Sequence, residues 1–153
     1  MIVKDATRKD YKIVNRMLTK LNNYHAIHAP EYCAHIDRYF TKKCFRALLN
    51  NTHKYFIAYI DDTPVGVVGV KISKQEKKQF VINELYVEDN YRKQGIGKTL
   101  LETAIKYAKR NIEEDKSFSK MVSIGVFDFN KDAWTLYKKM GFVPQSHNLS
   151  YKV

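Results

Sequence analysis

The stretch ELYVEDNYRKQGIGKTLL, residues 84–101, decides the fold of this chain. It begins as an apolar strand and ends with the apolar spacing of a helix, so a short loop must join two elements. Within that loop, Gly95 and Gly97 allow the backbone to bend tightly and to approach a ligand closely. The first N–H groups of the helix and its dipole add partial positive charge, and Arg92 and Lys93 add formal charge. This combination predicts a pyrophosphate cradle at the start of the helix.

Two other phosphate-binding motifs share some of these residues but differ in spacing. A P-loop needs four residues between its first glycine and the Gly-Lys-Ser/Thr ending, whereas only Ile96 separates Gly95 from Gly97-Lys98-Thr99. The dinucleotide fingerprint needs a third glycine at the position of Leu100. The remaining alternative is a helix start that contains glycine and binds nothing.

The rest of the chain alternates between helices and strands, with no linker and no internal repeat. The first half should contain a strand at Ile2-Val3, a helix over 8–23, a second helix that begins after Pro30 and carries Ile36, Phe40, Cys44 and Leu48, and a strand over 54–60. Strands over 65–72 and 79–87 and a helix over 97–110 should follow. The chain should end with a strand over 121–127, a helix through Ala133 and Met140, and a closing strand over 142–152. This order, β-α-α-β-β-β-α-β-α-β, predicts an α/β fold of the α+β kind with a mixed sheet. Three closely spaced strands should form an antiparallel meander, and the strand–helix–strand unit over 79–127 should be a right-handed parallel crossover.

Length and composition predict a single domain over residues 1–153, with 44% hydrophobic and 28% charged residues. No apolar run approaches the ~20 residues of a membrane-spanning helix, and the charged N-terminus is unlike a secretory signal. Cys33 and Cys44 are the only cysteines, which favours a reducing cytoplasm over a disulfide framework. The formal net charge is +11, of which +7 (11 basic minus 4 acidic groups) lies in residues 1–60. Such a field favours anionic partners, unless the lysines only solvate helix faces.

Two motifs in the second half of the chain resemble those of a known family. Arg92-x-x-Gly95-x-Gly97 is similar to the Q/R-x-x-G-x-G/A signature of the GCN5-related N-acetyltransferases (GNAT). Downstream, Asn130-x-x-Ala133-x-x-x-Tyr137-x-Lys139-x-Gly141-Phe142 resembles the second signature of that family, in which a helix ends in a tyrosine followed by Gly-Phe. The resemblance covers residues 79–143, whereas residues 1–60 match only in the order of their elements.

The resemblance implies a GNAT-like fold in which the strands over 79–87 and 121–127 splay apart, with a β-bulge in the former. It further implies that acetyl-coenzyme A binds in this gap as a co-substrate, and that no metal is needed. The residues implied in its binding are Leu85, Tyr86 and Val87 for the pantetheine arm, Arg92, Lys93, Gln94, Gly95, Ile96, Gly97 and Lys98 for the pyrophosphate, and Asn130 and Tyr137 on the opposite wall.

The resemblance also implies direct attack of an amine on the thioester, without an acyl-enzyme. A lysine-like amine with a pKa of ~10.4 is almost entirely protonated at neutral pH, so a base must take a proton, directly or through water. Glu84 is the candidate base, although it could also be an ordinary strand glutamate. Tyr137 is the position that faces the coenzyme sulfur in the family. We expect its hydroxyl to donate a hydrogen bond to the developing thiolate, and it could also pack in the core.

The segment between the first two predicted helices is rich in histidine and aromatic residues. Tyr24, His25, His28 and Tyr32 are expected either to line an acceptor pocket or to pack under a loop. The spacing of His25, His28, Cys33 and His35 matches no familiar zinc motif, so no metal site is expected.

Three functions fit the sequence to different degrees. The leading hypothesis is a cytoplasmic, acetyl-coenzyme A-dependent N-acetyltransferase that acts on a small-molecule or peptide amine, with a homodimer possible because family members often dimerise. The basic first half favours a neutral or anionic acceptor. A non-catalytic acyl-coenzyme A-binding module is the alternative. Nucleic-acid binding is suggested only by the pI near 9.6, and no helix-turn-helix or RNA-recognition pattern supports it.

Overall fold

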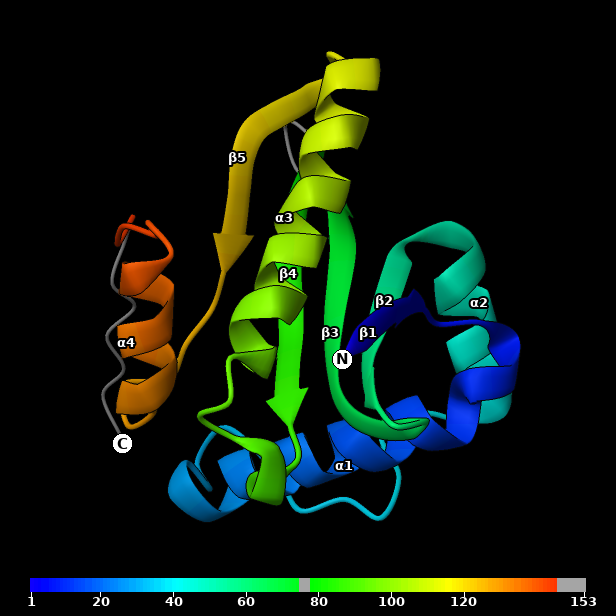
Figure 1. Cartoon of the computed structure of the whole chain (residues 1–153), viewed down its shortest axis with the longest axis vertical. Coiled ribbons are helices and arrows are strands. Elements are labelled where there is room, and N and C mark those ends of the chain that lie inside the picture. The colour runs from blue at the N-terminus through cyan, green and yellow to red at the C-terminus, as the bar shows by residue number, and fades with distance from the viewer. Residues whose placement is uncertain (75–77, 146–153) are drawn as a thin grey trace.

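The computed structural model describes residues 1–74 and 78–145 of the chain. Its elements, shown in Figure 1, are β1 (Ile2–Asp5), α1 (Tyr11–His28), α2 (Lys42–Asn51), β2 (His53–Ile60), β3 (Thr63–Lys74), β4 (Lys78–Val87), α3 (Ile96–Glu114), β5 (Phe118–Ile124) and α4 (Lys131–Lys139), with short 3-10 turns at Arg8–Asp10 and Asp89–Tyr91. No helix of this described part is long and apolar enough to cross a membrane.

The described strands form one sheet in the order β1-β2-β3-β4-β5. Neighbours from β1 to β4 are antiparallel, whereas β4 and β5 are parallel and are joined through α3. The β2–β3 hairpin turns at Asp61 and Asp62, which both have positive φ, as the twist of a tight hairpin requires. The predicted meander and parallel crossover are therefore confirmed.

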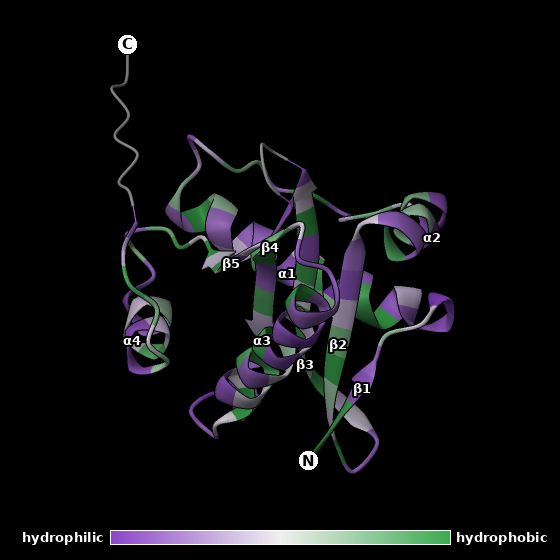
Figure 2. Ribbon diagram, turned by 90° about the horizontal axis from the view of Figure 1, so that it is seen from above, coloured by the Kyte–Doolittle hydropathy of each residue, from purple (hydrophilic) through white to green (hydrophobic). Residues whose placement is uncertain are grey.

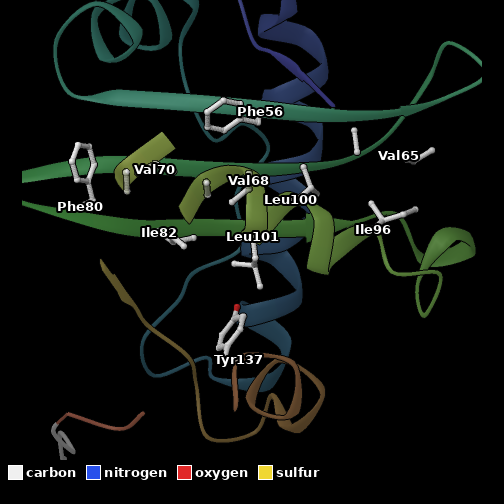
Figure 3. Packing of buried hydrophobic residues seen from close by; sticks show 13 residues of the cluster. Phe56, Val65, Val68, Val70, Phe80, Ile82, Ile96, Leu100, Leu101 and Tyr137 are labelled. Carbon is white, nitrogen blue, oxygen red and sulfur yellow. The ribbon is translucent and has the colours of Figure 1, made fainter. Parts of the chain in front are cut away.

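Two apolar clusters cover the two faces of this sheet. One cluster packs α3 against β3 and β4, and Figure 3 shows Leu100 and Leu101 beside Val68 and Ile82 in it. The other packs α1 and α2 against the opposite face, with Met17 among its fully buried residues. Figure 2 shows the outward surface of α3 as mainly hydrophilic, while the strands beneath it are mainly hydrophobic. This separation of polar and apolar faces is the pattern expected of an amphipathic helix on a sheet.

A β-bulge in β4 changes which face its side chains occupy. Val70 pairs with Ile82 and Gly69 pairs with Glu84, so Asn83 is an extra residue between two regular pairs. Ile82 packs in the α3 cluster, whereas Tyr86, four residues later, packs in the α1–α2 cluster. In a regular strand both would share one face, because side chains alternate with a period of two. The bulge expected from the family resemblance is thus present.

The prediction of a helix beginning after Pro30 was wrong. Helix α1 continues to His28, beyond the predicted end at residue 23, and α2 begins only at Lys42. The intervening segment, residues 30–41, runs as a loop whose backbone is held by side chains of α1. These hydrogen bonds are Asn22 Nδ2 to the Ala34 carbonyl (2.8 Å), Asn23 Nδ2 to the Ile36 carbonyl (2.9 Å), the Tyr39 N–H to Thr19 Oγ1 (3.1 Å) and the Phe40 N–H to Asn15 Oδ1 (2.8 Å). Tertiary hydrogen bonds therefore replace those of the expected helix.

The end of the chain also differs from the prediction. The strand β5 covers Phe118–Ile124, and residues 125–127 leave the sheet instead of extending the strand. Residues 142–145 form no strand, and the rest of the predicted closing strand, residues 146–152, lies outside the described residues.

Candidate active site

A cleft opens where β4 and β5 separate. Their pairing ends at Ile82 and Ile124, after which β4 continues to Val87. The cleft has a volume of about 330 Å³ and is lined by Leu21, His25, Ile82, Asn83, Glu84, Leu85, Ile124, Gly125, Val126, Phe127, Asn130 and Tyr137. Beyond Ile82, the side of β4 that faces the cleft has no strand paired with it among the described residues. Its backbone N–H and C=O groups are available to an extended ligand, as in β-strand addition.

The carboxyl group of Glu84 lies at the wall of this cleft and is 5% exposed. Its Oε1 accepts hydrogen bonds from the Tyr39 hydroxyl (3.2 Å) and from Asn83 Nδ2. Its Oε2 is buried without a hydrogen-bond partner in the described part of the chain. A side-chain carbon at Gly69 would lie 2.1 Å from Oε2, so only glycine leaves room for this carboxyl group.

The environment of Glu84 favours its protonated form. Burial raises the pKa of its carboxyl group, and the hydrogen bonds from Asn83 and Tyr39 and the charge of Lys71 oppose that rise only in part. A carboxyl group with a raised pKa in a cleft is suited to proton transfer near neutral pH.

Tyr137 enters the cleft from α4 and is held by the end of that helix. The Phe142 N–H bonds to the Tyr137 carbonyl (3.0 Å) and the Gly141 N–H to the Lys138 carbonyl (3.0 Å), which together form a Schellman motif. Gly141 supplies the positive φ of 87° that this motif requires. The ring of Phe142 packs on Tyr137 with their centroids 6.0 Å apart. In Figure 3 the hydroxyl group of Tyr137 is directed toward the strands.

Tyr137 is a hydrogen-bond donor at any physiological pH. Burial raises the pKa of its hydroxyl to about 12. Since the hydroxyl stays protonated, it can donate to negative charge that develops in the cleft.

The start of α3 carries the predicted anion-binding features. Gly95 is its N-cap with φ 82°, and no side chain caps the free N–H groups that follow it. Lys93 also has a positive φ of 60°, which shapes the loop that precedes the helix. At Gly97 a side-chain carbon would lie 3.4 Å from Leu136 and 3.8 Å from Val87, so a small residue fits between β4 and α4 but a large one would crowd them. Free N–H groups at the start of a helix are what a phosphate needs.

The model of the Acetyltransferase (GNAT) family matches residues 12–142 of the chain. The chain belongs to this family. It is 30% identical to the uncharacterized N-acetyltransferase MJ1207 of Methanocaldococcus jannaschii over 145 residues, which are 88% of this chain and 61% of that protein. The chain therefore spans about 61% of the length of this curated relative.

Solved structures share the GNAT fold of this chain. A crystal structure of a mutant BH1408 protein from Bacillus halodurans matches with a TM-score of 0.87 and 20% identity, over 100% of this chain and 99% of that one. The aminoglycoside N-acetyltransferase AAC(6')-Iy in complex with CoA matches with a TM-score of 0.69 and 11% identity, over 99% of this chain and 98% of that one. At such low identities the likeness shows the fold.

Five residues singled out from the sequence of this GNAT chain line the cleft together. They are His25, Glu84, Leu85, Asn130 and Tyr137. Asn130 also caps α4, since its Oδ1 accepts from the Ala133 N–H at 3.2 Å. Tyr86 and Ile96 instead bury their side chains in the two cores, so only their backbones remain for a ligand.

Arg92 of the loop before α3 is engaged with the protein itself. Its guanidinium group bonds to Asp89 (2.7 Å) and to the Val87 carbonyl (3.2 Å). It also lies 5.9 Å from the ring centroid of Tyr24 and 6.0 Å from that of Tyr86. Arg92 thus fixes the loop between β4 and α3, and its charge remains close to the helix start.

The other side chains of this loop are placed differently. Gln94 Nε2 donates to the Asn90 carbonyl at 3.2 Å, and Lys98 lies 3.8 Å from Glu102 along α3. Lys93 and Lys98 are largely on the surface, so both can reach toward an anion at the start of the helix.

Aromatic residues of α1, and Tyr32 of the loop after it, meet the loop between β5 and α4. Ring centroids lie 5.0 Å apart for His25 and Phe127, 5.1 Å for His28 and Phe129, 5.9 Å for Tyr24 and Phe129, and 6.2 Å for Tyr32 and Phe127. Of the four predicted acceptor residues, only His25 lines the cleft, whereas the others pack beside it. Burial and the neighbouring His28 lower the pKa of His25.

Sequence reasoning missed several residues of the cleft. Phe127 falls within the strand expected over 121–127 and Leu21 within the helix expected over 8–23, and neither was a candidate site residue. The available signal was Gly125 within the apolar run of residues 121–127, because an isolated glycine in a strand pattern suggests a bulge or a close approach of another backbone. The described residues contain no group of three or more His, Cys, Asp or Glu side chains that could hold a metal ion.

Proposed function

We propose that this chain transfers an acetyl group from acetyl-coenzyme A to a primary amine of a small molecule or a peptide, by direct attack of the amine on the thioester. The observation that carries this proposal is the cleft between β4 and β5, where Glu84 and Tyr137 come together from two different elements. Family membership supports it, and one neighbouring structure is named as an aminoglycoside N-acetyltransferase in complex with CoA.

The residues present fit acetyl-coenzyme A as a co-substrate. The uncapped N–H groups after Gly95, with Lys93 and Lys98 beside them, suit a pyrophosphate. The unpaired side of β4 at Leu85 suits the amide groups of a pantetheine arm. Asn130 and Tyr137 line the opposite wall of the cleft.

The chemistry follows from the two ionisable groups. Ionised Glu84 accepts a proton from the ammonium form of the acceptor, directly or through water, and so produces the neutral nucleophile. The amine forms a bond to the thioester carbonyl carbon, and the carbon–sulfur bond breaks. The nitrogen then loses its second proton, directly or through water, to the departing thiolate, so that coenzyme A leaves as the free thiol. Tyr137 donates a hydrogen bond to the sulfur as negative charge develops there. Holding both reactants in the cleft contributes up to ~7–11 kcal/mol through effective concentration.

We also propose that the enzyme works in the cytoplasm, a reducing compartment in which thiols such as those of Cys33 and Cys44 stay free.

The test is a panel of amines assayed for release of free thiol from acetyl-coenzyme A, together with calorimetric binding of coenzyme A. We expect binding and an amine-dependent release of thiol. Binding without release for any amine would instead identify a non-catalytic acyl-coenzyme A-binding module. Failure to bind coenzyme A would refute both functions.

A further inference from the structure

The loop over residues 30–41 is tied to α1 along its length, and we call it the α1 strap. Side chains of Asn15, Thr19, Asn22 and Asn23, which recur every one to four residues along α1, bond to the backbone of the strap. The Tyr11 hydroxyl adds a bond to the Phe40 carbonyl at 2.9 Å. A loop without helix or strand structure is thereby fixed in one position across the sheet.

The strap delivers one side chain to the cleft wall. The backbone N–H of Tyr39 is held by Thr19, and its ring stacks edge-on against Phe40, with centroids 4.6 Å apart. Phe40 is itself buried against Phe45 and Tyr55. With its backbone and its ring both fixed, Tyr39 places its hydroxyl 3.2 Å from Oε1 of Glu84.

Several groups face the Glu84 carboxyl group, but few stabilise its charge. Asn83 of β4 and Tyr39 of the strap donate to Oε1. Lys71 of β3 contributes only through its charge. Tyr55 of β2 lies beside Oε2. A side-chain carbon added at Gly69 would lie 2.6 Å from the Tyr55 ring and 2.1 Å from Oε2, so the ring and this oxygen are neighbours.

The remaining neighbours leave one carboxyl oxygen without a donor. The hydroxyl of Tyr55 and Oε2 of Glu84 are both buried without hydrogen-bond partners in the described residues. His25 of α1 lines the same cleft. A buried carboxylate that lacks a donor on one oxygen depends strongly on the donors to the other.

We propose that Tyr39 is a positioning residue of this site: its hydroxyl fixes the carboxyl group of Glu84 at the cleft wall and stabilises the ionised form that can accept a proton. The assignment of a catalytic task to Glu84 rests on the proposed acetyl transfer, whereas the contact between Tyr39 and Glu84 does not. Tyr39 itself touches no reacting atom.

The decisive variant is Tyr39→Phe, which keeps the ring and removes only the hydroxyl group. A hydrogen bond to a charged group is worth ~1.5–3 kcal/mol, so its loss should raise the pKa of Glu84 by about one to two units. The acidic limb of the kcat/KM profile should move to higher pH by the same amount. A merely structural role would lower activity without moving this limb.

The matched control is Tyr11→Phe. It removes a hydroxyl that holds the same strap through Phe40 but has no contact with Glu84. We expect its acidic limb to stay in place. An equal shift in both variants would overturn the proposal, since the strap as a whole would then be responsible.

A second readout separates this proposal from the proposed function. The Glu84 carboxyl carbon is titrated by NMR in protein labelled with ¹³C-glutamate, and Glu84→Gln identifies its signal. A higher titration midpoint in Tyr39→Phe than in the parent supports the positioning role, even if no amine is acetylated. An unchanged midpoint overturns the positioning role, even if the parent is an active acetyltransferase.

Discussion

At the scale of single residues, Tyr137 packs in the core, and in the proposed reaction it also has a chemical role. Its ring is part of the α3 cluster and contacts Phe142, while its hydroxyl lines the cleft. We expect Tyr137→Phe to lower kcat by about a hundred- to a thousand-fold, because removal of one donor to developing charge costs ~2.7–4 kcal/mol at most. Coenzyme A affinity, measured by calorimetry, should change little.

The control for Tyr137 is Tyr107→Phe. Tyr107 packs on Phe56 and Phe80 in the same cluster, away from the cleft. Full turnover in Tyr137→Phe would show that this tyrosine only packs in the core. Because the pKa of Tyr137 is about 12, its titration should add no alkaline limb to the rate profile below pH 10.

The buried carboxyl group of Glu84, the base of the proposed reaction, makes the stability of the fold depend on pH. Burial raises its pKa, so the folded chain holds the proton more tightly than the unfolded chain does. The stability contributed by protonated Glu84 is therefore complete below the unfolded pKa of ~4.3, and it is lost as pH rises through the folded pKa. We expect Glu84→Gln to raise Tm at pH 7, by about 2–4 °C for each 1 kcal/mol gained, and to abolish turnover.

The pH dependence of Tm distinguishes a gain caused by the Glu84 carboxyl group from a general gain in stability. The gain in Tm of Glu84→Gln should disappear at pH 4, where the parent carries a protonated Glu84. Glu113→Gln, at an exposed position on α3, should leave Tm unchanged at both values. A loss of stability in Glu84→Gln at pH 7 would mean that the carboxylate is favourable in the fold.

At the scale of elements, the start of α3 has room for only a small residue at Gly97. Its missing carbon faces Leu136 of α4 and Val87 of β4. A tryptophan at this position should fill the space beside the first N–H groups of α3 and block a pyrophosphate. We expect Gly97→Trp to lose coenzyme A binding by calorimetry, whereas Gly97→Ala should bind, because 3.4 Å is an ordinary contact distance.

A tryptophan elsewhere on α3 is the control for an effect of side-chain size that does not depend on position. Lys109 is exposed near the other end of α3, so Lys109→Trp should bind coenzyme A like the parent. The thermal unfolding of all three variants shows whether they fold. A folded Gly97→Trp protein with unchanged affinity would remove the start of α3 from the site.

At the scale of the whole molecule, the charge distribution bears on the choice of acceptor. The net charge is +11, yet no lysine or arginine of residues 1–74 and 78–145 lines the cleft, so the positive field of this described part acts on approach and not by contact. In residues 1–60, which carry +7, Arg16 and Lys20 already pair with Glu88. We expect a neutral or anionic acceptor to be favoured over a polyamine.

Salt tests this preference. Charges are screened beyond ~8 Å at physiological ionic strength, so the preference should weaken as salt rises. The measurement compares kcat/KM for one amine with and without a nearby carboxylate, at low and high salt. A polyamine preferred over both at low salt would show that Glu84 or another local acidic group governs the choice.

The sequence alone determined the features that depend on neighbours within one turn or one loop. The two glycines at the start of α3, and the Tyr137-to-Phe142 ending of α4, act through backbone conformation and local hydrogen bonds. They could be located because a positive φ or a free N–H group is tied to residue type and position. The meander was predictable for the same reason, since short turns force adjacent strands to pair.

Only the tertiary structure decided how distant segments meet at the cleft. Because of the bulge at Asn83, Glu84 and Tyr86 lie on the face of the sheet opposite to the one that regular alternation from Ile82 predicts. The position of a single extra residue could not be located from the apolar pattern of the sequence. The segment after Pro30 shows helical spacing, yet hydrogen bonds from α1 hold it as a loop and bring Tyr39 to Glu84. Such contacts join residues 20 to 45 positions apart, and tertiary contacts of this kind override local propensity.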